Sequence, residues 1–215
     1  MTKKISIADL RRDYSHHQLS ESDVDPDPIK QFASWFHEAL ESKLPEPNAM
    51  SLATVDAEGK PSLRIVLLKD VDERGFTFYT NYQSRKGAQL LQNPHAALTF
   101  HWVELERQVR IEGIVERVDD ADSEAYFNVR PLKSRLGAIA SAQSRPIGSR
   151  EALEQQFADA ERQYGETPPR PAHWGGYRLK PTWIEFWQGR RSRLHDRVAY
   201  TLDSHGQWLR ERLQP

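Results

Sequence analysis

Apolar residues near the beginning of the chain recur at the spacing of a helix. Between Asp27 and Leu44 they return every three or four residues, at Ile29, Phe32, Phe36, Ala39 and Leu40. This period gives a helix one apolar face. Asp27 suits the N-cap, and Pro28 suits the first turn because its φ angle is already helical and its missing N–H has no partner there. The sequence therefore predicts a helix that begins at Pro28 and ends before Leu44-Pro45.

From Met50 onward the pattern becomes that of β-strands. Short runs rich in β-branched and aromatic residues alternate with turn sequences such as DAEG and DERG. The predicted strands are 50–55, 62–69, 76–80, 96–103, 108–118, 177–180, 183–187, 198–202 and 208–213. Further helices are predicted at 84–92, 119–129, 132–140 and 149–164. Tight turns without regular strand–helix alternation indicate a mainly β fold with peripheral helices (α+β), its antiparallel sheet closed into a barrel.

The length of 215 residues suits one domain. Residues 1–25 are polar and are predicted to form a mobile N-terminal arm, and residues 26–215 to form the single domain. The start lacks an apolar leader, and no stretch approaches the 18 apolar residues of a membrane helix. We therefore expect a cytoplasmic protein.

Composition excludes several classes of function. Lys and Arg number 30 against 31 Asp and Glu, a balance that argues against a nucleic-acid coat or a polybasic membrane binder. The absence of Cys excludes disulfides, thiolate zinc sites and iron–sulfur clusters. The mean hydropathy of −0.76 is low, but six Trp, seven Tyr and eight Phe argue against disorder. No GxGxxG, GxxxxGK[ST], GxSxG or HExxH motif occurs, and no metal site is predicted from the scattered His residues.

Two cationic segments are candidates for anion binding. Arg85 and Lys86 begin a predicted helix, where the macrodipole disfavours positive charge unless a phosphate binds there; the alternative is a solvated pair. Arg64 and Lys69 bracket an apolar strand, which implies burial on both faces, as in a barrel wall covered by a partner. Buried cations there would need anionic partners, unless both side chains reach water from the strand ends.

Two further clusters combine aromatic and cationic residues. Tyr126 and Arg130 share a helix face with Ser134 just beyond, so they could hold a second phosphate or form an ordinary aromatic–Arg pair. Residues 183–197 join an aromatic strand to a basic loop. That combination suits a flat heteroaromatic ligand with a charged tail, or single-stranded nucleic acid; the net charge of −1 favours the small ligand.

Several of these segments, in this order, resemble the pyridoxine/pyridoxamine 5′-phosphate oxidase family. They are RIVLLK (64–69), FYTNYQSRKG (78–87), LERQV (105–109), YFNVRPLKS (126–134), AQS (142–144), WGGYR (174–178), IEFWQG (184–189), RLHDR (193–197) and RLQP (212–215). The resemblance runs from about Leu10 to the C-terminus, and RIVLLK followed by RLHDR is its most specific part. It implies a homodimer of FMN-binding split β-barrels, antiparallel and of Greek-key type, with FMN between the subunits.

The resemblance also implies residue roles. The residues that would line FMN are Arg64, Ile65, Val66, Leu67, Leu68, Lys69, Tyr79, Thr80, Arg85, Lys86, Gln108, Gln143, Ser144, Trp187 and Arg197. The substrate phosphate would be held by Lys69, Tyr126, Arg130 and Ser134. The substrate ring would contact Arg193, Leu194 and His195, and the catalytic group would be Arg193, His195 and Arg197. Arg11, Arg12, Asp13 and Tyr14 resemble a segment that folds over the occupied site, although Asp13 stands where the family often has Glu.

The implied reaction is the oxidation of pyridoxine 5′-phosphate or pyridoxamine 5′-phosphate by O₂ to pyridoxal 5′-phosphate. It would release H₂O₂, and NH₃ from the amine, and would complete the synthesis and salvage of vitamin B6. Three alternatives remain: another split-barrel FMN oxidoreductase with a different substrate, a non-catalytic module that binds flavin or pyridoxal phosphate, and a single-strand nucleic-acid binder. RLHDR and the Tyr126, Arg130 and Ser134 cluster weigh against the first.

Overall fold

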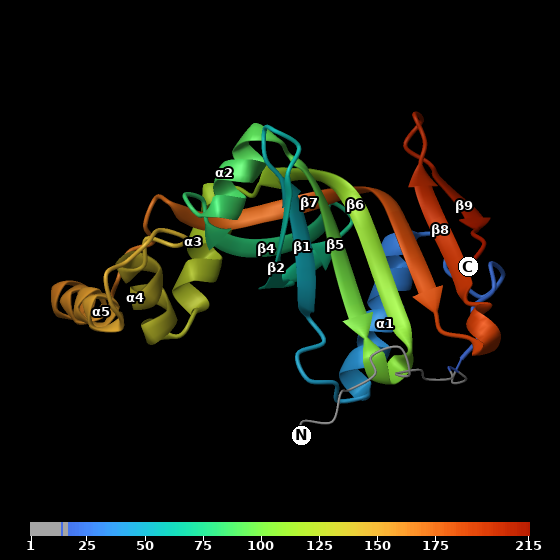
Figure 1. Cartoon of the computed structure of the whole chain (residues 1–215), viewed down its shortest axis with the longest axis horizontal. Coiled ribbons are helices and arrows are strands. Elements are labelled where there is room, and N and C mark those ends of the chain that lie inside the picture. Colours follow the sequence, from blue (N-terminus) through green and yellow to red (C-terminus); the bar gives the residue numbers. More distant parts are fainter. Residues whose placement is uncertain (1–13, 15–16) are drawn as a thin grey trace, which may run out of the picture. The chain divides into compact units, whose positions relative to one another are not determined.

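The computed structural model describes residues 14 and 17–215, which form two compact units (Figure 1). The central unit contains residues 48–99 and 111–182, and the terminal unit contains the described residues up to 47 together with 100–110 and 183–215. Three long strands run from one unit into the other along the chain: β5 (His95–Trp102), β6 (Arg107–Arg117) and β7 (Trp174–Gln188).

The central unit is built on a sheet with the strand order β2-β1-β5-β6-β7-β4-β3. Its other strands are β1 (Ala49–Val55), β2 (Pro61–Leu67), β3 (Asp70–Asp72) and β4 (Gly75–Asn81). The β1–β2, β1–β5, β3–β4 and β4–β7 pairs are all antiparallel. Leu52, Phe78 and Leu98 are fully buried between the strands. The prediction of a mainly antiparallel sheet is therefore confirmed.

Four helices belong to the central unit, and their bounds agree with the prediction to within one residue. They are α2 (Arg85–Gln92), α3 (Asp120–Val129), α4 (Leu132–Ala140) and α5 (Arg150–Tyr164). The Ser84 hydroxyl caps α2 by accepting a hydrogen bond from the Gly87 N–H, and Ser149 caps α5 in the same way. α4 begins after Pro131 and has no side-chain cap.

The terminal unit packs one helix against strands through aromatic residues. Its elements are α1 (Pro28–Glu41), the 3₁₀ turns η2 (Val103–Leu105) and η3 (Arg191–Arg193), and strands β8 (Asp196–Leu202) and β9 (Trp208–Arg212). The Asp27 carboxylate accepts from the Ile29 N–H, as predicted for the N-cap. The ring centroids of Phe32 in α1 and Phe100 are 5.0 Å apart. Those of Trp35 and Phe186 are 5.2 Å apart, and these two rings meet edge to face. β8 pairs antiparallel with β7 and with β9, which confirms the predicted C-terminal hairpin.

The described end of the predicted arm packs within the terminal unit. Leu19 and Val24 are buried, and the Leu19 N–H donates to the Asp196 carboxylate. The Tyr200 hydroxyl donates to the carbonyl oxygen of Asp25. Arg11, Arg12 and Asp13 lie outside the described residues.

Two strand predictions need correction. Segments 177–180 and 183–187 belong to one strand, β7, although Pro181 lacks the N–H that a ladder uses. Pro181 lies between the stretch paired with β4, which ends at Leu179, and the stretch paired with β8, which begins at Trp183. Strand β2 ends at Leu67 rather than Lys69.

Within the single chain, strand β2 is not buried on both faces, and its predicted cover by a partner stays a prediction. The side chains of Leu63 and Ile65 are 67% and 64% exposed in this chain, and the intervening Arg64 is half-buried. No helix in the described residues is both long and apolar enough to cross a membrane.

Candidate active site

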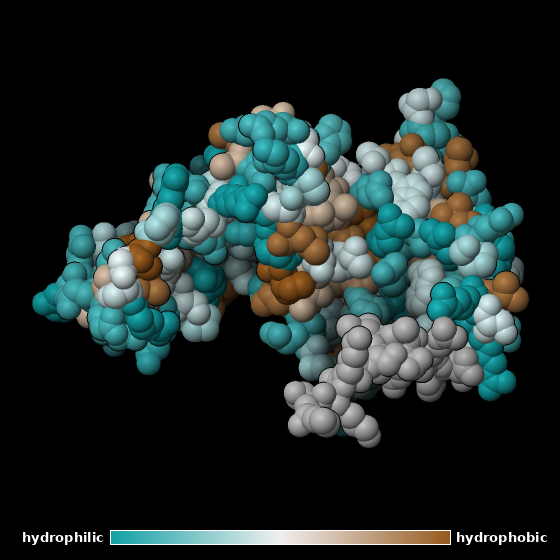
Figure 2. Space-filling view, viewed as in Figure 1, coloured by the Kyte–Doolittle hydropathy of each residue, from teal (hydrophilic) through white to brown (hydrophobic). Residues whose placement is uncertain are grey.

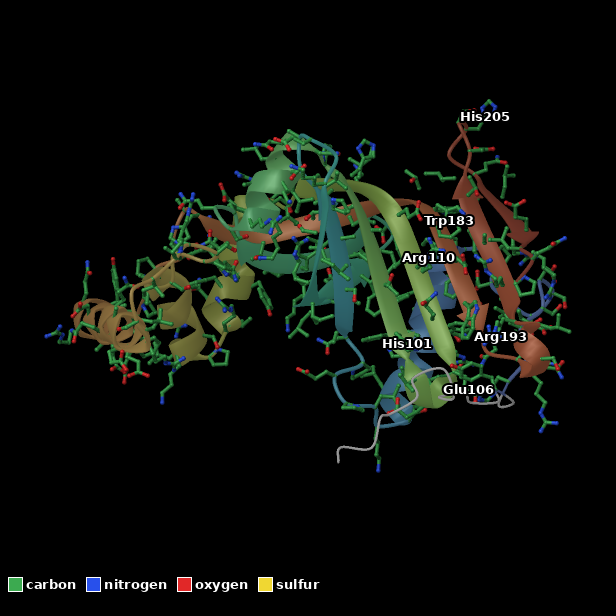
Figure 3. The ribbon with its side chains drawn as sticks, in the orientation of Figure 1. His101, Glu106, Arg110, Trp183, Arg193 and His205 are labelled. Atoms are coloured by element: carbon green, nitrogen blue, oxygen red, sulfur yellow. The ribbon has the colours of Figure 1, made fainter. Side chains whose placement is uncertain are left out.

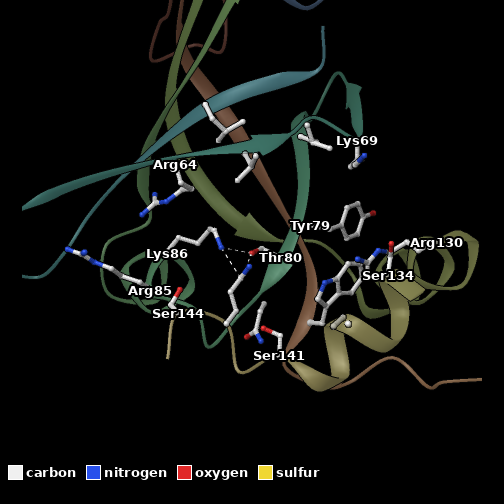
Figure 4. Close-up of a pocket in the computed structure, with 18 of the residues that line it drawn as sticks. Arg64, Lys69, Tyr79, Thr80, Arg85, Lys86, Arg130, Ser134, Ser141 and Ser144 are labelled. Atoms are coloured by element: carbon white, nitrogen blue, oxygen red, sulfur yellow. Dashed lines mark hydrogen bonds between the residues drawn. The ribbon is translucent and has the colours of Figure 1, made fainter. Parts of the chain in front are cut away.

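A cavity of about 950 Å³ opens in the central unit (Figure 4). Strands β2 and β4, the start of α2, and the α3–α4 junction supply most of its wall. The predicted residues that line it are Arg64, Ile65, Val66, Leu67, Lys69, Tyr79, Thr80, Arg85, Lys86, Tyr126, Arg130, Ser134, Gln143 and Ser144. Leu68 is buried in the core instead and does not line the cavity.

The cavity wall is strongly cationic. It contains Arg64, Lys69, Arg85, Lys86 and Arg130 and, among the described residues, no carboxylate. Its cations form two groups: Figure 4 shows Arg64, Arg85 and Lys86 on one side, and Lys69 and Arg130 with Tyr79 on the other. Uncompensated positive charge in a concave site favours an anionic ligand.

The first group is fixed by neutral oxygen atoms. Arg64 Nη1 donates to the Leu52 carbonyl at 3.0 Å and to Thr54 Oγ1 at 2.6 Å. Its Nη2 donates to Ser62 Oγ at 2.6 Å and to Gln89 Oε1 at 3.3 Å. Burial, reinforced by the neighbouring Arg85 charge, lowers the pKa of Arg64. The guanidinium is therefore held in place without a counter-charge.

Lys86 is held in the same manner at the start of α2. Its Nζ donates to Thr80 Oγ1 at 2.7 Å, Gln143 Oε1 at 3.0 Å and Ser84 Oγ at 3.1 Å (Figure 4). Only 8% of the residue is exposed. Burial, with a smaller contribution from Arg64, lowers the pKa of Lys86 to about 8. Both cations at this helix start, Arg85 and Lys86, line the cavity, and their role in binding a phosphate stays a prediction.

The second group surrounds the start of α4. Arg130 Cζ lies 4.5 Å from the centroid of the Trp174 ring, and its Nη1 is buried without a hydrogen-bond partner. Burial lowers the pKa of Arg130. Ser134 lies in the first turn of α4, which has no side-chain cap, and the start of a helix favours an anion. Tyr126 stacks on Tyr79 at 4.0 Å, and burial raises the pKa of Tyr79 to about 12.

Several predicted residues lie in the terminal unit and do not line this cavity. They are Tyr14, Gln108, Trp187, Arg193, Leu194, His195 and Arg197. The His195 ring lies 4.6 Å from Trp187 and 5.8 Å from Tyr14. Its Nδ1 accepts from the Arg190 backbone N–H at 3.1 Å, so the proton of the neutral ring is on Nε2. Burial, reinforced by the Arg193 charge, lowers the pKa of His195.

The loop around His195 is strained and anchored by an ion pair. Ser192 and Arg193 both adopt left-handed backbone conformations, with φ of 57° and 61°. Such strain is typical of functional loops. Arg197 donates to both oxygen atoms of the buried Glu185, at 2.9 and 2.8 Å. Unlike the cavity cations, Arg197 is therefore charge-compensated.

The cavity also contains residues to which the sequence analysis assigns no role, including Ser62, Gly137, Ser141 and Trp174. A signal for Trp174 was present in the Gly175-Gly176 pair that follows it. A Cβ atom at Gly176 would lie 2.8 Å from the Tyr79 ring, and one at Gly175 would collide with the Tyr82 hydroxyl. The glycines allow the aromatic rings to lie against β7.

Comparisons with known proteins identify the family of this chain. The family model described as pyridoxamine 5′-phosphate oxidase matches residues 36–188, and the model described as the pyridoxine 5′-phosphate oxidase C-terminal dimerisation region matches 174–215. A curated pyridoxine/pyridoxamine 5′-phosphate oxidase of Janthinobacterium sp. (strain Marseille) is 66% identical over 211 residues, covering 98% of this chain and 100% of the relative.

Two solved structures share the fold. PhzG from Burkholderia lata 383, in complex with tetrahydrophenazine-1-carboxylic acid, matches with a TM-score of 0.86 and 32% identity, covering 90% of this chain and 95% of PhzG. A pyridoxamine 5′-phosphate oxidase-related, FMN-binding protein from Nostoc punctiforme PCC 73102 matches with a TM-score of 0.70 and 20% identity, covering 89% and 100%. The fold is thus the predicted FMN-binding split-barrel type, and the chain belongs to the pyridoxamine 5′-phosphate oxidase family.

Proposed function

We propose that this protein is an FMN-dependent oxidase of pyridoxine 5′-phosphate and pyridoxamine 5′-phosphate. The alcohol and O₂ would give pyridoxal 5′-phosphate and H₂O₂; the amine, O₂ and water would give the same products and NH₃. The names of relatives 60–66% identical over nearly the whole chain support this activity.

The cationic cavity is the observation that carries the proposal. Burying cations without counter-charges is costly, and an anionic ligand offsets that cost. The cavity has two separate cationic groups and, in the described chain, no carboxylate in its wall, so it fits two phosphate monoesters, one from FMN and one from the substrate. The buried, unpartnered Arg130 Nη1 is a donor available to the second phosphate.

Each cationic group has a proposed role. Arg64, Arg85 and Lys86 hold the FMN phosphate, with Thr80, Gln143 and Ser144 beside it, while strand β2 lines the flavin. Lys69, Tyr126, Arg130 and Ser134 hold the substrate phosphate. When bound, FMN supplies the acceptor for the hydride equivalent from the substrate's C4′ carbon. The chain's own contribution is to fix both phosphates, which sets the relative position of the two ring systems.

The terminal-unit residues are proposed to complete the site in a homodimer with FMN between the subunits, in keeping with the matched dimerisation region. Gln108, Trp187 and Arg197 would contact FMN, and Arg193, Leu194 and His195 the substrate ring. Neutral His195 would donate a hydrogen bond from Nε2 and orient the ring. Tyr14, with Arg11, Arg12 and Asp13 outside the described residues, would cover the occupied site.

Peroxide release tests the activity. The purified protein should show a flavin absorption spectrum and should release H₂O₂ when pyridoxine 5′-phosphate is added. Arg193→Leu should lower kcat/KM for that substrate while the flavin content is unchanged, because Arg193 is proposed to contact only the substrate. A flavin-bound protein that gives no peroxide with either vitamer phosphate would instead support a split-barrel FMN oxidoreductase with another substrate.

A further inference from the structure

We propose that Trp174 is a positioning residue for phosphate recognition. Its indole face holds the Arg130 guanidinium so that the N–H groups of Arg130 remain available to the substrate phosphate. The inference rests on the proposed function and assigns a role to a residue that the WGGYR motif contains but that has no role in the proposed reaction.

The geometry of the pair is the first argument. Trp174 is the first residue of β7, is 5% exposed and lines the cavity. The Arg130 guanidinium carbon lies 4.5 Å from the Trp174 ring centroid, within the range of a cation–π contact. Arg130 Nη1 is buried and has no hydrogen-bond partner. Trp174 is thus a close neighbour of a cation whose donors are unused.

The shape of a guanidinium explains why this arrangement suits a ligand. The group is planar, and its five N–H donors point outward in its plane. An aromatic ring contacts the face of that plane, whereas a carboxylate binds its edge and neutralises its charge. Stacking on Trp174 therefore restricts Arg130 without occupying its donors and without reducing its charge.

Two other Arg–Trp contacts among the described residues provide the comparison. Arg107 lies 4.3 Å from the Trp35 ring and also donates to the Glu38 carboxylate at 2.7 Å. Arg110 lies 5.2 Å from the Trp183 ring and also donates to Glu185 at 3.3 Å (Figure 3). Both of these arginines are paired with a carboxylate.

Arg130 differs from both. No described carboxylate oxygen lies within ion-pair distance of its guanidinium, and the stack on Trp174 is its closest cation–π contact. A stack that serves only stability can include an acid, as the other two do. We expect an arginine to lack a carboxylate partner where its charge serves to bind an anionic ligand.

The indole is itself held rigidly. It stacks on Tyr79 at 5.5 Å with an interplanar angle of 15°, and it lies nearly parallel to Tyr126, at 6.2 Å and 10°. Phe127 meets it edge-on at 5.2 Å. These aromatic contacts fix the ring against which Arg130 lies, and one of them comes from Tyr126, which is itself proposed to bind the substrate phosphate.

Fluorinated tryptophan separates this electrostatic role from a structural one. Site-specific replacement of Trp174 by analogues carrying one to four fluorine atoms lowers the electron density of the ring face while its shape is nearly kept. The probes are 4-deoxypyridoxine 5′-phosphate, which lacks the oxidisable C4′ hydroxyl, and 4-deoxypyridoxine, which also lacks the phosphate. Their dissociation constants are measured by calorimetry on the full-length protein, so no turnover is involved.

The affinity for the phosphorylated probe should fall progressively with fluorination, by about three- to tenfold at four fluorine atoms. The affinity for the unphosphorylated probe should stay constant. The same replacement at Trp35 is the matched control and should change neither, because Arg107 is paired with Glu38. Trp174→Phe should keep more of the phosphate preference than Trp174→Leu.

The outcomes separate this inference from the proposed function. If the unmodified protein binds both probes equally, the substrate-phosphate site is absent and the proposed function fails. If it prefers the phosphorylated probe but fluorination at Trp174 leaves that preference unchanged, or weakens both probes alike, Trp174 is only structural and the inference is overturned.

Discussion

At the scale of single residues, the partners of the cations distinguish the cavity from the rest of the molecule. Arg64 and Lys86 are held by hydroxyl, carbonyl and amide oxygen atoms, whereas Arg170 and Arg197 are held by carboxylates. A neutral oxygen fixes the position of a cation but leaves its charge in place. The residues around the cavity therefore preserve positive charge, while pairing elsewhere neutralises it.

Replacing Arg130 tests whether this cluster of residues binds the substrate phosphate. Because hydrogen bonds to charged groups are worth about 1.5–3 kcal/mol, Arg130→Ala should lower kcat/KM for pyridoxine 5′-phosphate by roughly 10- to 150-fold. Against unphosphorylated pyridoxine the same substitution should have little effect, because the partner of Arg130 is already missing. The exposed Lys133 does not line the cavity, and Lys133→Ala is the control. Equal losses for both substrates from Arg130→Ala would contradict the assignment.

Gly137 is a cavity residue whose replacement should stabilise the protein. It lies inside α4, where glycine costs about 0.5–1 kcal/mol relative to alanine, and an added Cβ atom would meet nothing within 4 Å. Gly137→Ala should therefore raise the free energy of unfolding of the flavin-free protein by about 0.5–1 kcal/mol in urea denaturation. Gly87→Ala should lower the free energy of unfolding instead, because its Cβ would collide with the Tyr82 carbonyl oxygen. A destabilised Gly137→Ala protein would show that something outside the described chain fills this space.

At the scale of elements, the sequence predicts best the helices that begin at a residue typical of a helix start, such as a proline or an N-cap serine. α4 matches its predicted range because Pro131 fixes its start, and α2 follows the N-cap Ser84. The pattern predicts two strands where the structure has one, because nothing local shows that β7 continues through Pro181 from the stretch paired with β4 to the stretch paired with β8.

The site was predictable only in part for the same reason. Cations at a helix start are visible in the sequence, so Arg85 and Lys86 were found. The contacts of Gln89 with Arg64, and of Trp174 with Arg130, join elements that are distant in sequence. Such contacts depend on strand register, which local patterns do not specify.

Lys86, at the start of α2, should make both the free energy of unfolding and the affinity for FMN depend on pH. The folded-state pKa of Lys86 is about 8, below its ordinary 10.5, so between these values the folded protein binds fewer protons than the unfolded chain. The contribution of Lys86 to the free energy of unfolding therefore rises with pH across that window. Phosphate binding has the opposite trend: it needs the protonated amine, so FMN affinity should fall as pH rises through about 8.

Calorimetry on flavin-free protein checks this prediction. FMN binding near pH 8 should take up protons, seen as a heat that depends on the ionisation enthalpy of the buffer. Riboflavin, which lacks the phosphate, should show no such uptake. Lys86→Met should abolish the pH dependence, whereas Arg85→Met should weaken FMN binding and keep it. Proton uptake that persists in Lys86→Met would assign the titration to another group.

At the scale of the whole molecule, the predicted site residues divide between the two units. The cationic cavity lies in the central unit, and RLHDR lies in the terminal unit, more than a hundred residues after strand β2. The family resemblance indicates both the cavity residues and RLHDR. The sequence of one chain does not show how a second copy would bring these two groups of residues together. The exposed face of β2 bears on that question, because Leu63 and Ile65 are apolar, exposed and part of the cavity wall. Figure 2 shows apolar side chains gathered over this part of the central unit.

We expect this face of β2 to be covered in a homodimer. The protein should sediment at about twice the 24.9 kDa of one chain, and flavin should be lost when the dimer dissociates. In a two-fold interface each substitution occurs twice. Burying one Ile side chain contributes about 1.5–3 kcal/mol, so Ile65→Lys should weaken the dimer by about 3–6 kcal/mol, roughly 10²- to 10⁴-fold in its dissociation constant. Leu91, equally apolar, 77% exposed and outside the cavity wall, is the control, and Leu91→Lys should remain dimeric with full flavin. Sedimentation over a range of protein concentrations measures both variants. If Ile65→Lys dimerises as tightly as Leu91→Lys, strand β2 is not part of the subunit interface, and the flavin site is not completed across it.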